Sequence, residues 1–126
     1  MSFIFRRLFS STPSAMSEAA QTKAQKLIDE NAVMVFSKSY CPYCNNTKRI
    51  LDSVDAKYRV YELNQESDGD DIQAALLKIT GQRTVPNVFI GQKHIGGNSD
   101  LEKVASNTQQ FQERLREVGA IGKDEL

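Results

Sequence analysis

The sequence predicts an α/β fold built on one mixed sheet, and two observations carry this prediction. An apolar run at 32–36 is followed closely by a helical pattern that starts at Pro42, and a strand-like segment at 58–63 then completes a β-α-β unit. Farther along the chain, two short strand-like segments are separated by Gly91-Gln92, a glycine-first pair suited to a hairpin. We therefore expect parallel and antiparallel strands in one sheet.

Length and composition favour a single domain. The chain has 126 residues, of which 40% are hydrophobic, enough for one core. Its 16 basic residues balance its 16 acidic residues, so there is no basic excess of the kind that nucleic acid attracts, and no apolar run is long enough to span a membrane. We expect a monomeric domain at 17–120 and a polar tail at 121–126, with neither nucleic acid nor membrane as a partner.

The N-terminal segment, residues 1–16, has the composition of a mitochondrial targeting sequence. Arg6 and Arg7 lie among large apolar residues, serine is frequent, and no acidic residue is present; a disordered tail is the alternative. Initiation at Met16 would give a cytosolic form, so we expect a mitochondrial location, a cytoplasmic location or both. The final residues 123–126 match the address for retention in the endoplasmic reticulum. We interpret this match as accidental, because the two arginines interrupt the apolar core that a secretory signal needs.

The first half of the predicted domain contains two helices and two strands. Ser17 is placed to cap a first helix. The apolar residues that recur in that helix at helical spacing are Ala20, Ala24, Leu27 and Ile28. The run at 32–36 is continuously apolar, as is typical of a central strand covered on both faces. The segment at 58–63 is rich in β-branched and aromatic residues and predicts a second strand.

The second half begins with a helix and a hairpin. Asp70 and Asp71 favour a helix start, and Gly81 lies where a C-terminal cap belongs. The segments 88–90 and 93–95 then predict the two strands of the hairpin.

Two further helices are expected after the hairpin. The run from Ser99 to Glu102 has the capping-box pattern, so we expect a helix to begin at Ser99. Phe111 and Leu115 lie on the apolar face of a final helix that ends at Gly119.

The motif Cys41-Pro42-Tyr43-Cys44 contains the only two cysteines of the chain. Pro42 suits the first position of a helix, because its fixed φ is helical and its missing N–H would be unpaired there anyway. Cys41 would then lie at the N-terminal cap, where free amides and the helix dipole favour a thiolate. Cys44 would lie in the first turn, more buried but close enough to form a disulfide. Lys38 adds a positive charge shortly before the motif.

Three interpretations of the cysteine pair compete. Structural zinc needs four ligands, and beyond the two cysteines the chain offers one histidine, His94; we expect no metal. An inert core pair would leave Pro42 and its strand-turn-helix setting unexplained. A redox centre needs one exposed nucleophilic sulfur and one resolving sulfur, which this spacing supplies. Thr84-Val85-Pro86 lies just before the hairpin. A trans bond before the proline is the statistical default; a cis bond beside a thiol site would leave the backbone of Val85 free to pair with an extended substrate.

Taken together, these residues resemble the dithiol glutaredoxins, close to the fungal members. The resemblance spans about residues 17–118. It rests on four blocks in the family's order: KSYCPYC at 38–44, DIQ at 71–73, GQRTVP at 81–86 and GQKHIGGNSD at 91–100. It implies a thioredoxin-like fold, in which about five helices flank a four-stranded mixed sheet, and a cis bond before Pro86. It also implies glutathione as reductant and co-substrate.

The resemblance assigns roles to the motif and to residues around it. Cys41 matches the family nucleophile and Cys44 the resolving thiol. Lys38 and Gln73 match positions that hold the glycine carboxylate of glutathione, and Tyr43 lies beside its sulfur.

The later blocks supply the remaining matches. Arg83 is a further contact, and the segment 84–86 matches the one whose backbone pairs with the tripeptide. Ser99 and Asp100 match the clamp on the γ-glutamyl end, so that Ser99 would serve both as helix cap and as ligand. Asn98 occupies a variable position, to which we assign no role.

The implied activity is glutathione-dependent thiol–disulfide exchange. Cys41 alone would reduce mixed disulfides between proteins and glutathione, and Cys41 with Cys44 would reduce protein disulfides; glutathionylated and disulfide-containing proteins are the expected partners. A thioredoxin is disfavoured because the chain has no tryptophan. The alternative is an iron–sulfur carrier, in which two chains and two glutathiones share a cluster. Pro42 argues against it, because cluster binding in this family goes mainly with a small residue there or with single-cysteine motifs.

Overall fold

The computed structural model describes residues 13–122, with side chains from Ser17 onward. The predictions made for residues 1–12 and 123–126 therefore lie outside the described residues. The elements, in chain order, are α2 (Pro13–Glu30), β1 (Val33–Ser37), α3 (Pro42–Ser53), β2 (Arg59–Glu62), α4 (Gly69–Thr80), β3 (Asn87–Ile90), β4 (Lys93–Gly96), α5 (Asn98–Ala105) and α6 (Thr108–Glu117).

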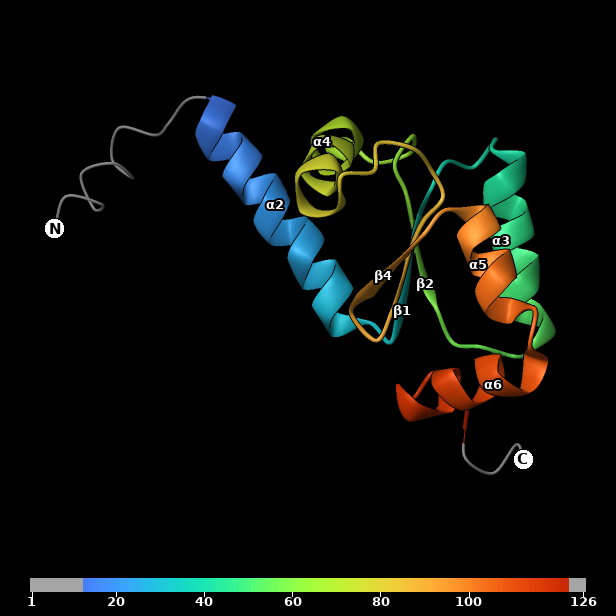
Figure 1. Ribbon diagram of the computed structural model, residues 1–126. Coiled ribbons are helices and arrows are strands. Elements are labelled where there is room, and N and C mark those ends of the chain that lie inside the picture. The colour runs from blue at the N-terminus through green and yellow to red at the C-terminus, as the bar shows by residue number, and fades with distance from the viewer. Residues whose placement is uncertain (1–12, 123–126) are drawn as a thin grey trace, which may run out of the picture.

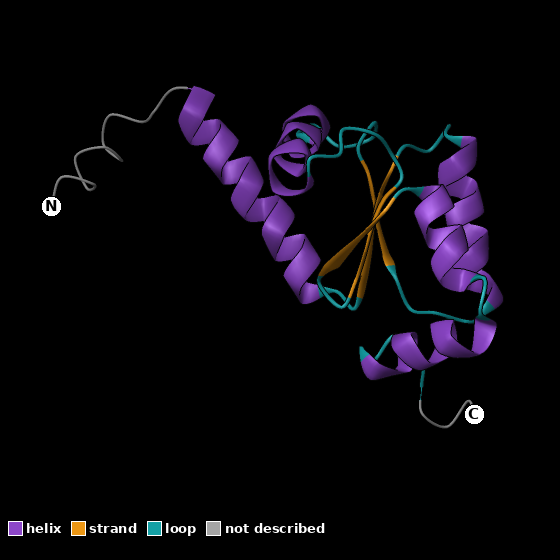
Figure 2. Ribbon diagram, in the orientation of Figure 1, coloured by secondary structure: helices purple, strands orange, loops and turns teal. Residues whose placement is uncertain are grey.

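The four strands form one mixed sheet in the order β2-β1-β3-β4 (Figures 1 and 2). β1 pairs in parallel with β2 and antiparallel with β3, and β3 pairs antiparallel with β4. The hairpin turn places Gly91 at φ 57° and Gln92 at φ 69°, and two positive φ values define a type I′ turn, whose twist matches that of the strands. The prediction of a mixed four-stranded sheet is confirmed.

Helices cover both faces of the sheet. α2 and α4 lie on one face, α3 and α5 on the other, and α6 runs past the end of the second layer (Figure 1). Along β1, Met34 and Phe36 face the first layer, whereas Val33 and Val35 face the second. All four side chains are fully buried, which confirms that the apolar run is a strand covered on both faces. Among the described helices, none is long and apolar enough to cross a membrane.

Two predicted helix starts are wrong by a few residues. α2 begins at Pro13, so that Ser17 lies inside the helix, where its hydroxyl accepts a hydrogen bond from Lys78 Nζ at 3.1 Å. A proline suits the first turn of a helix, and this signal lies upstream of the serine. α5 begins at Asn98 with Gly97 as its N-cap, and the Asp100 carboxylate accepts the Gly97 N–H at 2.9 Å. Asp100 thus plays the return half of a capping box two positions earlier than predicted.

One polar cluster joins three elements on the α2 side of the sheet. Lys23 in α2 forms an ion pair with Asp68, the N-cap of α4, with 2.5 Å between Nζ and Oδ2. The Tyr61 hydroxyl of β2 donates to the other carboxylate oxygen at 2.6 Å. The hydrogen bonds from Lys23 and then Tyr61 hold the pKa of the Asp68 carboxyl below its ordinary value.

We expect Asp68→Asn to lower the free energy of unfolding at pH 7 by about 0.5–1 kcal/mol, the usual range for a partly exposed ion pair. Because the folded-state pKa of Asp68 lies below the unfolded value, its contribution is complete above the unfolded pKa of about 3.9 and is lost as pH falls through the folded pKa. Urea denaturation from pH 7 down to about pH 2 should therefore show the gap between wild type and variant closing in acid. Glu66→Gln, at an exposed loop position, serves as the control, and a gap that stays constant with pH would contradict this account.

Candidate active site

The first thiol lies at the N-terminus of α3. Cys41 is the N-cap, with extended backbone angles, and Pro42 occupies the first helical position. The Cys44 N–H donates to Cys41 Sγ at 3.3 Å. An amide hydrogen bond and the positive end of the helix dipole both stabilise negative charge on this sulfur. The predicted placement of the motif is confirmed.

The turn before Cys41 is braced from outside the motif. The Cys41 N–H donates to the Lys38 carbonyl at 3.0 Å, closing the turn. The side chain of Asn64, just after β2, binds this turn twice. Its Oδ1 accepts a hydrogen bond from the Ser39 N–H at 3.0 Å, and its Nδ2 donates to the Ser39 hydroxyl at 2.7 Å. The thiol is therefore held by two neighbouring strand ends.

The second thiol occupies a different environment. Cys44 is fully buried, whereas Cys41 is partly exposed, and both are free thiols. Burial raises the pKa of the Cys44 thiol, and the hydrogen bond with Cys41 raises it further. The nucleophilic reactivity of a cysteine depends on the fraction of its thiol that is ionised to thiolate and on the exposure of its sulfur. The pair is therefore asymmetric, with Cys41 placed to attack an external sulfur and Cys44 placed to attack only Cys41.

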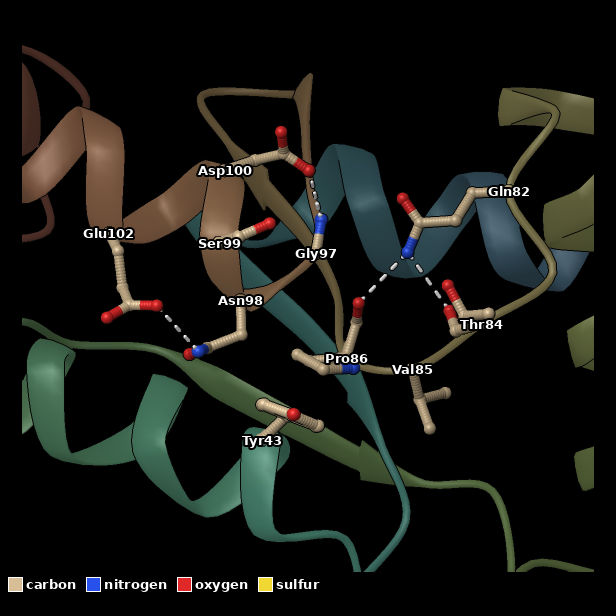
Figure 3. Close-up of a pocket in the computed structure, with 10 residues that line it drawn as sticks. All are labelled: Tyr43, Gln82, Thr84, Val85, Pro86, Gly97, Asn98, Ser99, Asp100 and Glu102. Atoms are coloured by element: carbon tan, nitrogen blue, oxygen red, sulfur yellow. Dashed lines mark hydrogen bonds between the residues drawn. The ribbon is translucent and has the colours of Figure 1, made fainter.

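Residues 38–43 are called the thiol turn below. A cleft of about 570 Å³ lies on one side of it (Figure 3). Tyr43 lines one wall, the loop before β3 a second, and the start of α5 a third; Tyr43 is 68% exposed, so its ring is available to a ligand. The Val85–Pro86 bond in the loop is cis, as the resemblance implied. The lining residues are Tyr43, Gln82, Thr84, Val85, Pro86, Gly97, Asn98, Ser99, Asp100 and Glu102.

A second cleft, of about 460 Å³, is lined by Lys38, Asp70, Gln73, Ala74, Leu77 and Arg83. It therefore gathers the other three predicted ligand residues. Lys38 and Arg83 supply two positive charges suited to a carboxylate. Gln73 already uses part of its donor capacity, because its Nε2 donates to the Arg83 carbonyl at 2.8 Å.

The nine predicted binding residues thus divide between two clefts. Cys41 itself lines neither; along the chain it lies between Lys38, which lines one cleft, and Tyr43, which lines the other. Arg83 and Thr84 divide in the same way, so the thiol turn and the loop before β3 border both clefts. An elongated ligand with a carboxylate at one end could therefore occupy both clefts and place a central sulfur near Cys41.

Four residues that line the first cleft were not predicted as site residues from the sequence: Gln82, Gly97, Asn98 and Glu102. The side-chain oxygen of Asn98, Oδ1, accepts hydrogen bonds from the buried Thr47 hydroxyl at 2.9 Å and from the Asn46 side-chain amide at 3.0 Å. Its own amide donates to the Glu102 carboxylate at 3.1 Å. This buried asparagine ties the second turn of α3 to the first turn of α5, and so sets the distance between the thiol helix and the far wall of the first cleft.

We expect the Thr47–Asn98 hydrogen bond to couple the two helices energetically. Thr47→Val preserves the shape of the buried side chain but removes the donor, and should lower the free energy of unfolding by about 1–2 kcal/mol. In a double-mutant cycle with Asn98→Ala, urea denaturation should give an interaction energy of at least about 0.5 kcal/mol. A cycle of Thr47→Val with Thr22→Ala, at an exposed position in α2 on the other face of the sheet, should give about zero. Equal values in the two cycles would show that the bridge does not couple the helices.

The burial difference predicts selective alkylation. Iodoacetamide at neutral pH should add once to the native protein, at Cys41, because Cys44 is fully buried and its thiol pKa is raised. Mass spectrometry should locate the adduct, and Cys41→Ser should stay unlabelled over the time that labels the wild type. Labelling in denaturant, where both cysteines should react, is the control. Equal native labelling of the two cysteines would contradict the asymmetry.

The chain is similar in sequence and in structure to known proteins. A family model described as glutaredoxin matches residues 33–95. A Ricinus communis glutaredoxin is 55% identical over 81% of this chain and 99% of its own length, and Schizosaccharomyces pombe glutaredoxin-2 is 46% identical over 73% and 84%. The crystal structure of a buckwheat glutaredoxin–glutathione complex superposes with a TM-score of 0.80 at 51% identity, covering 84% of this chain and 96% of that one. A plant relative is thus more similar than this fungal one.

Proposed function

This chain belongs to the glutaredoxin family, and from that premise we propose that it uses glutathione to reduce mixed disulfides between glutathione and proteins. The observation that carries the proposal is the setting of Cys41: its sulfur caps α3 and accepts an amide hydrogen bond, and its chain neighbours Lys38 and Tyr43 each line one of the two clefts. The buckwheat relative in complex with glutathione supports the choice of co-substrate.

In the proposed complex, the second cleft receives the glycine carboxylate of glutathione. Lys38 and Arg83 offer charge-assisted hydrogen bonds to it. Gln73 Nε2 has one hydrogen left after its bond to the Arg83 carbonyl. Its part in binding is therefore at most one hydrogen bond, and the two cations dominate.

The first cleft receives the rest of the tripeptide. The backbone of Val85 pairs with its extended chain, and the exposed Tyr43 ring lies beside its sulfur. At the start of α5, free amides suit the γ-glutamyl carboxylate. Because Gly97 and not Ser99 is the N-cap, the Ser99 hydroxyl is released from capping and can bind the ligand. Asp100 uses Oδ2 for the Gly97 N–H, which leaves Oδ1 for the ammonium group.

The proposed reaction is thiolate exchange. The Cys41 thiolate attacks the glutathione sulfur of the mixed disulfide; the old S–S bond breaks, a Cys41–glutathione bond forms, and the protein thiolate leaves and takes up a proton. A second glutathione thiolate then attacks the bound glutathione sulfur, which releases oxidised glutathione and restores Cys41. The sum converts one mixed disulfide and one glutathione into a protein thiol and glutathione disulfide.

Protein disulfides require the second cysteine. Cys41 attacks one sulfur of the client, and Cys44 then attacks Cys41, which releases the client as a dithiol and leaves an internal disulfide that two glutathiones reduce. The burial of Cys44 suits this step, because its only accessible electrophile is the neighbouring Cys41 sulfur.

Two cysteine variants separate these routes. In an assay with glutathione, glutathione reductase and NADPH, Cys41→Ser should lower turnover of a glutathionylated peptide to the uncatalysed rate. Cys44→Ser should keep this turnover and lose reduction of a protein disulfide. Asn45→Ser, an exposed change in the same helix turn, should behave like wild type. Turnover by Cys41→Ser would refute the assignment of the nucleophile, and no glutathione-dependent turnover by wild type would refute the function.

A further inference from the structure

Two glutamine side chains hold the carbonyl groups of the loop before β3. Gln73 Nε2 donates to the Arg83 carbonyl at 2.8 Å. Gln82 Nε2 donates to two carbonyls, those of Thr84 and Pro86, each at 3.0 Å. A primary amide has two N–H donors, so one side chain can serve both oxygens. Figure 3 shows the Gln82 amide nitrogen directed at these two groups, on either side of Val85.

In the segment 83–86 of this loop, Val85 is the one residue whose carbonyl accepts no hydrogen bond from either glutamine side chain. Within residues 13–122, neither its N–H nor its carbonyl has a hydrogen-bond partner. Its side chain packs against the core cluster beneath α2 and α4, while the residue also lines the first cleft. The side chain is thus anchored toward the core, and the polar backbone groups remain for a ligand in the cleft.

Gln82 is itself anchored to the end of α4. Its backbone N–H donates to the Thr80 hydroxyl at 3.0 Å, and that hydroxyl donates to the Leu76 carbonyl at 2.8 Å. The chain of contacts therefore runs from a packed helix, through Gln82, to the two peptide groups that flank Val85. Without it, the Thr84 and Pro86 carbonyls lose the contacts that fix their direction.

We propose that Gln82 is a positioning residue for glutathione: it holds the Thr84 and Pro86 carbonyls so that the backbone N–H and carbonyl of Val85 are the groups presented to the tripeptide. This inference rests on the proposed function and assigns Gln82 no contact with the reacting sulfur atoms. It predicts an effect on recognition of the glutathione moiety and none on the reactivity of Cys41.

The variant Gln82→Met tests this proposal, since methionine is close in size, uncharged and unable to donate a hydrogen bond. We expect the KM for a glutathionylated peptide to rise about 5- to 20-fold, the effect of losing one or two neutral hydrogen bonds. The kcat and the rate of Cys41 alkylation by iodoacetamide should stay within about twofold of wild type, because the thiol turn is untouched. Gln109→Met, at an exposed position in α6, is the matched control and should change none of the three.

The outcomes separate this inference from the proposed function. An inactive wild type, or an active Cys41→Ser, would overturn the function before Gln82 is considered. With an active wild type, an unchanged KM in Gln82→Met would overturn the positioning role. A rise in KM accompanied by equal falls in kcat and in the alkylation rate would also overturn it, because that pattern indicates a general structural role.

A second test keeps Gln82 in place and so does not depend on the folding of Gln82→Met. Hydrogen exchange followed by NMR should show the Gln82 side-chain amide protected both before and after glutathione is attached to Cys41 in Cys44→Ser. The Val85 amide should exchange rapidly in the free protein and become protected in the adduct. A Gln82 amide that exchanges at the solvent rate in both states would contradict the proposal.

Discussion

The burial of β1 on both faces is the constraint on which the rest of the molecule depends. Met34 and Phe36 enter one apolar cluster and Val33 and Val35 the other. A one-residue slip would exchange these faces and disrupt both clusters at once, so the register of the strand is strongly fixed. The thiol turn begins where this strand ends, at Ser37, and thus starts from backbone that is paired on both sides and covered on both faces. Its position relative to both clefts follows from that strand.

Local sequence signals were sufficient to predict helix ends where the chemistry of a residue favours one backbone conformation. Pro42 fixed the start of α3, and with it the place of Cys41, because the ring and the missing N–H both suit that position. Gly81 ended α4 in the left-handed region, at φ 79°. The two wrong helix starts, at Ser17 and Ser99, have a feature in common: a second start signal lies a few positions upstream, Pro13 in one case and Gly97 with its bond to Asp100 in the other.

The same contrast between local signals and tertiary contacts separates the site residues that were predicted from those that were missed. The two thiols and the charged ligand residues Lys38, Arg83 and Asp100 were predicted from sequence motifs; the charged residues line the two clefts, and Cys41 lies at the start of α3. Asn98 and Gln82 were missed because their roles depend on partners that residue type does not reveal. The donors to Asn98 come from a helix 51 and 52 residues away, and Gln82 binds backbone carbonyls, which every residue possesses. Such contacts become visible only when the loop has a defined path.

The burial of Cys44 also bears on how the protein withstands oxidants. Peroxide converts an accessible thiolate to a sulfenic acid, and a second equivalent carries it irreversibly further unless a thiol intervenes. Cys41 is the exposed target, and the thiol of Cys44 lies one helical turn away, shielded from the same attack. Condensation of the two releases water and leaves a disulfide that glutathione can reduce. In the proposed cycle, the buried second cysteine would thus act as an internal repair group, because the disulfide formed after oxidation is the same one that the proposed dithiol route forms.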